Sequence, residues 1–274
     1  MRYSDLRDWL TIVEGMGELK RLTGAHWNLE IGAITDVVHH TEPSPALLFN
    51  AIPNYAPGHG ILVNAMHSRN RLAVTMGLPT GLKDLEIIAQ LRQKIAALKP
   101  IPPRFVPSGP ICENVLTGNS IDITQFPAPK WHEHDGGRYI GTGCIVLTQD
   151  PDDGWVNLGT YRVMVHDRET LGLYISPGKH GRIHRDKCFA RGAPLKVAIA
   201  LGSEPLLFLG SCMEMPHGVS EYDFVGGWRG APVEVVKGEF SGLPIPAGAE
   251  IVVEGECLPD TRKEEGPFGE FTGY

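Results

Sequence analysis

The sequence predicts an α+β protein in which a small N-terminal α/β domain, residues 1–103, precedes a β-rich domain, residues 104–274. Apolar residues recur at helical spacing in several segments before residue 99, whereas later apolar segments are short and separated by glycine and proline. The run Lys-Pro-Ile-Pro-Pro at residues 99–103 is a semi-rigid connector, and we expect the domain boundary there.

The first domain is expected to contain helices at residues 4–15, 29–40 and 82–98 and short strands at residues 46–50 and 60–66. Ser4 is the expected cap of the first helix, in which Trp9 and Val13 lie on one apolar stripe. The last helix should stop before Pro100, because the residue preceding a proline disfavours helix.

The second domain should be built mainly from strands, at residues 143–148, 156–165, 196–201, 205–209, 233–237 and 250–256, with one helix at residues 222–228. Several strands with few helices between them indicate a β-barrel or a sandwich. The 33 glycines and 22 prolines fit this reading, because turns between short strands need them.

Composition excludes several functional classes. With 25 lysine and arginine residues against 32 aspartate and glutamate residues, the net charge is −7, and no basic cluster offers a nucleic-acid partner a surface. No apolar run approaches the ~20 residues of a membrane span, and the charged N-terminus does not resemble a signal peptide. The five cysteines are dispersed without a CxxC pair, which favours reduced thiols in a cytoplasmic protein.

The first chemical motif lies in residues 155–162, Trp-Val-Asn-Leu-Gly-Thr-Tyr-Arg. In a strand, side chains five residues apart point to opposite faces, so Asn157 and Arg162 should diverge unless a bulge intervenes. Gly159 is the position at which a bulge, or the close approach of a flat ligand, costs least. An ordinary strand with a solvated arginine is the alternative.

Two further motifs contain possible metal ligands. His180 sits between glycines in a basic loop, where it could bind a metal while Lys179 and backbone amides face a phosphate; an exposed loop histidine is the alternative. In residues 210–221, carbonyls of a Gly-Ser turn suit a hard cation and Glu221 can supply a carboxylate oxygen. The alternative is that Ser220 caps a helix with Glu221 in its first turn.

The fourth motif is Glu-Gly-Pro-Phe-Gly-Glu at residues 265–270. Its Gly-Pro-Phe-Gly turn can bring Glu265 and Glu270 to one site beside a cation such as Arg162. A polar surface turn is the alternative.

The order and spacing of these four motifs resemble the UbiD-like family of prenylated-FMN-dependent (de)carboxylases, over nearly the whole chain from Ser-Asp-Leu-Arg-Asp-Trp-Leu to Glu-Gly-Pro-Phe-Gly-Glu. The resemblance implies an N-terminal α/β domain followed by a split β-barrel that binds prenylated FMN. It also implies a divalent metal, Mn²⁺ or Mg²⁺, that bridges to the flavin phosphate, and a neighbouring K⁺.

The resemblance assigns roles residue by residue. The divalent metal would be held by Asn157, His180 and Glu221, and the K⁺ by the turn containing Ser211 and Met213. The residues implied to bind the cofactor are Asn157, Leu158, Gly159, Thr160, Tyr161, Arg162, Lys179 and His180. The implied catalytic group is Glu265, Arg162 and Glu270.

In the implied reaction, a small aromatic or α,β-unsaturated carboxylic acid gains or loses CO2. Arg162 would orient the carboxylate, Glu270 would protonate the carbon left behind, and Glu265 would hold Arg162 in place. A flavin prenyltransferase would supply the cofactor. An additional carboxylate at Glu214, next to the metal motif, is expected to face solvent.

The family members are usually longer and continue into a C-terminal α/β domain used for dimerisation. The chain is therefore expected to be a fragment, half of a split enzyme that needs a partner subunit, or a subunit of a larger carboxylase. It is also expected to form a homo-oligomer or to bind a partner that supplies that domain. Two other functions remain open: a plain FMN-dependent split-barrel oxidoreductase, and a non-catalytic subunit of a multi-subunit carboxylase. A metal hydrolase built on His180 and Glu221 is disfavoured, because no second histidine lies at a spacing that completes a zinc site.

Overall fold

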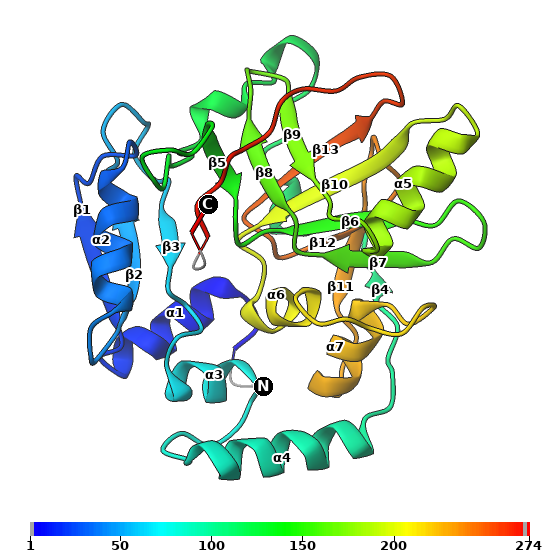
Figure 1. Ribbon diagram of the computed structural model, residues 1–274. Helices are drawn as coiled ribbons and strands as arrows, with labels where there is room; N and C mark the ends of the chain where they lie inside the picture. The colour runs from blue at the N-terminus through cyan, green and yellow to red at the C-terminus, as the bar shows by residue number, and fades with distance from the viewer. Residues whose placement is uncertain (1–2, 271–272) are drawn as a thin grey trace.

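The computed structural model describes residues 3–270 and 273–274 and contains helices and strands in both halves of the chain (Figure 1). The helices are α1 (Leu6–Gly15), α2 (Glu30–His39), α3 (Arg69–Thr75), α4 (Asp84–Ala97), α5 (His180–Ala190), α6 (Pro205–Ser211) and α7 (Glu221–Arg229). Short 3-10 helices lie at Pro110–Cys112, Gly118–Ser120 and Ile123–Gln125.

The strands are β1 (Leu19–Thr23), β2 (Ala46–Asn50), β3 (Ile61–Val63), β4 (Arg104–Phe105), β5 (Arg138–Gly141), β6 (Ile145–Gln149), β7 (Val156–Gly159), β8 (Arg162–Val165), β9 (Leu171–Tyr174), β10 (Leu195–Leu201), β11 (Glu234–Lys237), β12 (Pro244–Pro246) and β13 (Ile251–Cys257). In the described part of the chain they form four sheets, with the orders β1-β2-β3, β13-β10-β6-β7, β12-β11-β4 and β5-β8-β9. None of these sheets closes on itself, so the split barrel stays a prediction.

The first half of the chain follows the expected pattern closely. Helix α1 buries Trp9 and Val13 completely, but its N-cap is Asp5, which accepts the backbone N–H of Asp8 at 2.8 Å. Ser4, the expected cap, instead donates its hydroxyl to the Asp8 carboxylate. Aspartate and serine are equally good caps, so the cap position could not be decided from residue type. Strand β1 and helix α3 were not expected.

The largest hydrophobic core joins the two halves of the chain. It contains Trp9 of α1, Leu147 of β6 and Tyr222 of α7. The indole N–H of Trp228 in α7 donates to the carbonyl of Met76, the C-cap of α3, at 2.9 Å. Helix α7 is therefore held near its start by Tyr222 in the core and near its end by Trp228, and these contacts position its first residue, Glu221.

One predicted strand is a helix. Residues 205–209 form the first turns of α6, which starts with proline at its first helical position and buries Pro205, Leu206 and Leu207. A short apolar run buried on several sides has no periodicity, so sequence cannot separate a buried strand from a buried helix. The expected helix at residues 222–228 is present as α7, and Ser220 is its N-cap.

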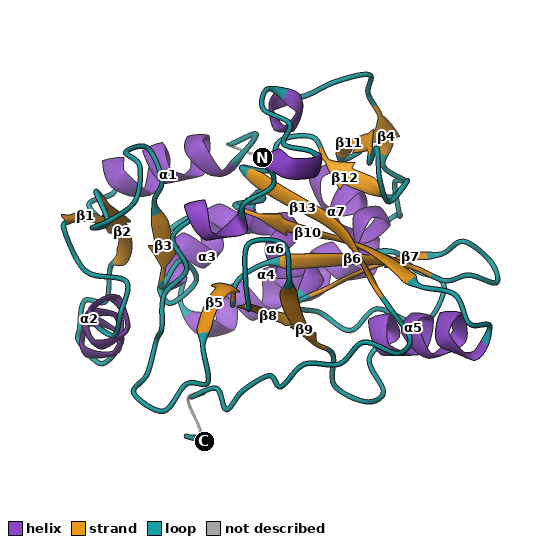
Figure 2. Cartoon of the chain, turned by 90° about the horizontal axis from the view of Figure 1, so that it is seen from above, coloured by secondary structure: helices purple, strands orange, loops and turns teal. Residues whose placement is uncertain are grey.

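The strand predicted at residues 156–165 is two strands in different sheets. Strand β7 pairs with β6, whereas β8 pairs with β5 and β9. Between them the Tyr161 ring folds back over Gly159, where an added Cβ atom would lie 2.3 Å from the ring. Seen from above, in Figure 2, β7 and β8 belong to separate layers of the β-rich half. Side-chain alternation therefore does not carry through from Asn157 to Arg162.

None of the helices described has both the length and the apolarity needed to cross a bilayer.

Candidate functional site

A small cavity of about 70 Å³ lies where β7 ends and the N-termini of α5 and α7 approach it. Predicted site residues make up most of its lining: Asn157, Leu158, Gly159, Thr160, Tyr161, Lys179, His180, Ser211, Met213 and Glu221. Cys212 and Glu214 complete it. Three segments that are far apart in the sequence, residues 157–161, 179–180 and 211–221, therefore meet at one place, which we call the β7 pocket.

Glu221 is the buried acid of the β7 pocket. Its side chain accepts the backbone N–H of Leu158 at 2.7 Å, and the residue is 2% exposed. Burial raises the pKa of the Glu221 carboxyl to about 7. No lysine or arginine of the described chain lies within ion-pair distance of it. A carboxylate in this position would be stabilised by a cation.

His180 is the first residue of α5, not part of a loop as predicted. Its ring packs edge-on against Trp155 with 4.7 Å between centroids. Burial and the neighbouring His217 lower the pKa of His180, which favours the neutral imidazole that binds metals. The basic sequence around it hid the helix, because its apolar stripe is short: only Gly181, His184 and Cys188 are buried.

Asn157 and Tyr161 close another side of the β7 pocket. The Asn157 amide N–H lies 3.4 Å from the Tyr161 hydroxyl, which also accepts the backbone N–H of Gly181 at 3.2 Å. The Tyr161 ring fits between Gly159 and Gly181, where added Cβ atoms would meet it at 2.3 and 2.8 Å. Both glycines are thus required by close packing around one tyrosine.

The Gly-Ser turn forms the end of α6. The Thr160 hydroxyl lies 3.0 Å from that of Ser211, which donates to the carbonyl of Phe208 at 2.7 Å. Glu214 forms an ion pair with Lys179, with 80% of its side chain exposed, in agreement with the expectation that it faces solvent. Met213 is 37% exposed.

The donor types in the β7 pocket are an amide, an imidazole, a carboxylate and hydroxyls. No group of three or more His, Cys, Asp or Glu side chains suited to a metal occurs in the described residues. Of the predicted metal ligands, His180 and Glu221 are a histidine and a glutamate, whereas the others are asparagine, serine and methionine. The mixed set suits a hard divalent cation that also takes oxygens from a phosphate, and it does not suit a tetrahedral zinc site.

The second site is an ion-pair cluster on β8. Arg162 donates from Nε and Nη2 to the two oxygens of Glu265, both at 2.8 Å. Its Nη1 lies 3.5 Å from Glu270, whose side chain is 54% exposed. The hydrogen bonds to Glu265 raise the pKa of Arg162, so the guanidinium stays charged.

Aromatic rings enclose the guanidinium of this cluster. Its carbon lies 4.5 Å from the Tyr174 ring centroid and 5.5 Å from that of Phe268. Phe268 in turn packs on Tyr139 at 4.5 Å. These contacts restrict Arg162 to one orientation, and the structure thereby brings together all three residues of the predicted catalytic group.

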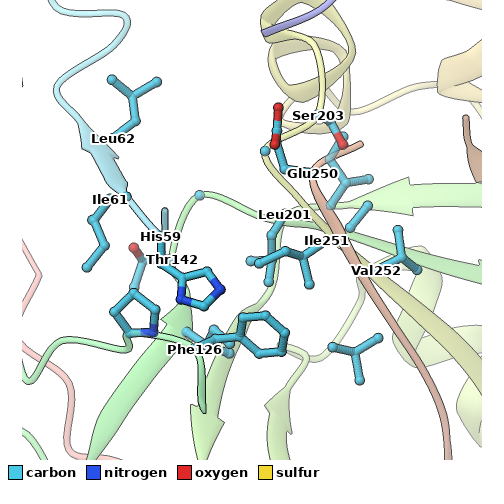
Figure 3. A pocket seen from close by; sticks show the side chains of 18 of the residues that line it. His59, Ile61, Leu62, Phe126, Thr142, Leu201, Ser203, Glu250, Ile251 and Val252 are labelled. Carbon is cyan, nitrogen blue, oxygen red and sulfur yellow. The ribbon is translucent and has the colours of Figure 1, made fainter. Parts of the chain in front are cut away.

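A much larger cavity, about 2700 Å³, separates the first sheet from the β-rich half. Figure 3 shows Ile61 and Leu62 of β3 on one side and Leu201, Ile251 and Val252 of β10 and β13 on the other. Glu270 lines this cavity, so the ion-pair cluster borders it. The sequence did not predict the cavity, because it lies between elements distant in the chain.

Two residues at these sites were missed. Trp155 contacts His180, and Asp135 accepts hydrogen bonds next to Glu270. The Asp-Gly-Gly sequence of Asp135 indicated a turn but not these contacts, because a turn aspartate typically binds the backbone two residues later, whereas Asp135 accepts from Trp131, His132 and Gly269. Trp155 had no sequence signal.

Comparisons with known proteins agree with this geometry. The family model described as 3-octaprenyl-4-hydroxybenzoate carboxy-lyase Rift-related domain matches residues 104–274, and the corresponding N-terminal domain model matches residues 10–94. The pyrrole-2-carboxylic acid decarboxylase of Pseudomonas aeruginosa is 40% identical over 278 residues, which cover 98% of this chain and 56% of that protein.

Two solved structures are also similar. Vanillic acid decarboxylase of Sedimentibacter hydroxybenzoicus, in its closed form, has a TM-score of 0.92 at 31% identity and covers 99% of this chain. An evolved dimeric form of the UbiD-class enzyme HmfF from Pelotomaculum thermopropionicum, in complex with prFMN, has a TM-score of 0.87 at 32% identity and the same coverage. This chain spans 58% and 61% of those two chains. With these matches along almost its full length, the chain belongs to the UbiD family.

Proposed function

We propose that this chain carries the cofactor-binding and catalytic residues of a reversible, non-oxidative decarboxylase that acts on aromatic or α,β-unsaturated carboxylic acids. Its cofactors would be prenylated FMN, a divalent metal (Mn²⁺ or Mg²⁺) and K⁺. The division into residues 1–103 and a split-barrel domain at residues 104–274 is part of this proposal.

The observation that carries the proposal is the arrangement of Arg162 between Glu265 and Glu270. Glu265 takes up the Nε–Nη2 edge of the guanidinium, and the Nη1–Nη2 edge, which Glu270 approaches at 3.5 Å, remains for a substrate carboxylate. A substrate carboxylate bound there would lie next to Glu270, the more exposed of the two acids. An FMN-dependent oxidoreductase has no need for this grouping.

The β7 pocket supports the cofactor assignment. Its buried carboxylate without a cationic side-chain partner in the described residues, its imidazole and its hydroxyls suit a metal bound to a phosphate. Asn157, His180 and Glu221 would hold the divalent metal, and the turn at Ser211 and Met213 the K⁺. Thr160 and Lys179 would face the phosphate, and Arg162 stands two residues beyond Thr160.

The residues then divide the work as follows. When bound, prenylated FMN supplies the electron sink that decarboxylation of an unsaturated carbon needs. Arg162 binds the substrate carboxylate bidentately and fixes its plane. Glu265 holds Arg162 in that orientation. Glu270 delivers a proton to the carbon that has lost CO2, and takes one up in the carboxylation direction.

Several partners belong to the proposal. A flavin prenyltransferase would supply the cofactor. The matched relatives are longer than this chain, and HmfF is described as dimeric in an evolved form. A homo-oligomer, or a partner polypeptide that covers the open side of the site, would exclude water from the reacting atoms.

Co-expression with a flavin prenyltransferase tests the proposal. We expect mass spectrometry of the released flavin to show prenylated FMN, and the purified protein to release CO2 from pyrrole-2-carboxylate, vanillate or a cinnamate-type acid. Activity that appears only after a partner chain is added would identify a subunit of a larger carboxylase. Plain FMN with NAD(P)H oxidation would contradict the proposal.

A further inference from the structure

Asp135 is a buried carboxylate that the proposed reaction does not use. Its side chain is fully inaccessible to solvent. It follows the turn at Trp131 and His132 and precedes Gly136 and β5. A buried carboxylate needs several hydrogen-bond donors to offset its loss of hydration.

Backbone and hydroxyl donors from two separate parts of the chain supply that compensation. One oxygen of Asp135 accepts the N–H groups of His132 at 2.9 Å and Trp131 at 3.2 Å. The other accepts the N–H of Gly269 at 2.8 Å and lies 3.3 Å from the Tyr274 hydroxyl. The carboxylate therefore joins the 131–136 turn to the residue directly before Glu270.

A second contact runs parallel to this one. The N–H of Gly136 donates to the carbonyl of Pro267 at 2.8 Å. A Cβ atom on Gly136 would lie 2.0 Å from the carbonyl oxygen of Gly266, and one on Gly269 would lie 2.7 Å from the His132 ring. The 131–136 turn and the 265–270 segment thus pack closely at both glycines, with backbone against backbone at Gly136 and the His132 ring against the backbone at Gly269.

The two acids of the ion-pair cluster are held in different ways. Glu265 is held through its side chain by two hydrogen bonds to Arg162. Glu270 has a half-exposed side chain with one 3.5 Å contact to Arg162, and among the described residues its backbone bonds to Gly273 alone. The position of Glu270 therefore depends mainly on where its backbone is anchored, and the anchor nearest to it is the bond from Gly269 to Asp135.

We propose that Asp135 is a positioning residue that places Glu270 relative to Arg162, and so sets where the proton is delivered. The effect on proton delivery rests on the proposed function, whereas the placement of Glu270 by Asp135 does not. Asp135 touches neither substrate nor cofactor. It acts through Gly269 on the neighbouring glutamate, while Glu265 and Arg162 keep their own contacts.

Amide hydrogen exchange of the full chain without cofactor tests the structural part. In the wild-type protein the Gly269 amide should be protected, and exchange there at the rate of an unstructured peptide would overturn the inference without any variant. In Asp135→Asn, the side-chain NH2 group replaces one of the two carboxylate oxygens. In either orientation it faces backbone N–H donors, of Trp131 and His132 or of Gly269, and cannot accept from them. We expect Gly269 to exchange about tenfold faster or more, because a hydrogen bond to a charged acceptor is lost.

Asp150 offers a matched control. It is equally buried, and it accepts hydrogen bonds from Lys187 and the backbone N–H of Asp152. Asp150→Asn should leave Gly269 exchange unchanged. Tyr274→Phe removes the 3.3 Å hydroxyl contact to Asp135 and the 3.1 Å bond from the His134 N–H, but leaves the Gly269 bond in place, so it should give a smaller increase than Asp135→Asn. Unchanged Gly269 exchange in a folded Asp135→Asn protein would refute the anchor.

Kinetics of the cofactor-loaded protein test the catalytic part. Displacing Glu270 should lower kcat by up to about 10²-fold, since small misplacements of a reacting group are this costly, while KM and the amount of bound flavin stay near wild type. A rise in KM with kcat unchanged would mean that Asp135 serves binding instead. If wild-type protein shows no decarboxylation but Gly269 is protected, the proposed function fails and the anchor stands.

Discussion

The ion-pair cluster and the β7 pocket are both assembled from distant segments, but they balance charge in opposite ways. In the cluster, Arg162 is neutralised by Glu265 at 2.8 Å and also approached by Glu270. In the β7 pocket, Glu221 is buried with one backbone N–H as its hydrogen-bond partner. In the first region the buried charge has a partner within the chain, whereas the second region is suited to an added cation.

The two regions also differ in the structure that holds their side chains. Two helix N-termini present His180 and Glu221 to the β7 pocket, so these two side chains are held by regular structure. The cluster instead depends on an irregular segment, residues 265–270, which is held by hydrogen bonds to Arg162, Gly136 and Asp135. Substitutions in the cluster should therefore act on chemistry, and those in the β7 pocket on ligand binding.

The largest effect is expected from Glu270→Gln. The variant should lower kcat of the cofactor-loaded protein by about 10²–10⁴-fold, because an amide cannot deliver the proton. Product formation in a single turnover is the measurement. Glu264→Gln, at an exposed neighbouring position, is the control. Wild-type turnover in Glu270→Gln with cofactor bound would exclude Glu270 as the proton donor.

The next effect sharpens the description of the β7 pocket. His180→Ala should weaken Mn²⁺ binding at least about tenfold, the loss seen when even an indirect support of a metal ligand is removed. His217→Ala is its matched control, because His217 packs on Trp155 at 4.8 Å much as His180 does at 4.7 Å, but does not line the pocket. Titration calorimetry with MnCl2 measures both. Equal affinity in the two variants would remove His180 from the ligand set.

The free energy of unfolding is expected to depend on pH through His184, which lies one helical turn beyond His180 in α5. His184 is fully buried, its Nδ1 lies 3.0 Å from the Thr148 hydroxyl, and burial lowers the pKa of His184 to about 4. Between the unfolded value of 6.5 and about 4 the unfolded chain binds more protons, so the free energy of unfolding should fall as the pH falls. The loss attributable to His184 should be about 2 kcal/mol at pH 5.

Urea unfolding at pH 5 and pH 7 measures this effect. Asp150, Lys187 and His180 also face His184, so the comparison is made with His184→Gln, which does not titrate. The variant should lose less stability than wild type on acidification. Identical changes in the two proteins would show that His184 does not contribute.

The smallest expected effect is on stability, and it compares the contributions of Glu265 and Glu270 to the ion-pair cluster. Glu265→Gln should lower the free energy of unfolding by about 1–2 kcal/mol, since it weakens a bidentate, mostly buried pair. Glu270→Gln should cost less than about 1 kcal/mol, because the 3.5 Å contact of Glu270 is exposed. Chemical denaturation of both variants gives the comparison, and a larger loss for Glu270→Gln would reverse our description.

Much of the local structure was predictable from sequence. Helix α7 and its cap Ser220, helix α4 ending before Pro100, and strand β10 follow from periodicity and punctuation. The errors fall on helices whose sequences show no helical period. Helix α6 reads as a strand because its apolar run is too short to show a period, and α5 reads as a loop because few of its residues face the core.

The sequence by itself determined which chemical groups are present and in what order, including the Glu-Gly-Pro-Phe-Gly-Glu turn and its resemblance to the family. Only the tertiary structure decided that strand β7 ends at Gly159, so that Asn157 and Arg162 lie in different sheets. It also decided that Asp135 anchors the residue beside Glu270. Such contacts join residues more than a hundred positions apart, and local propensities carry no information about pairings that depend on how packed layers meet.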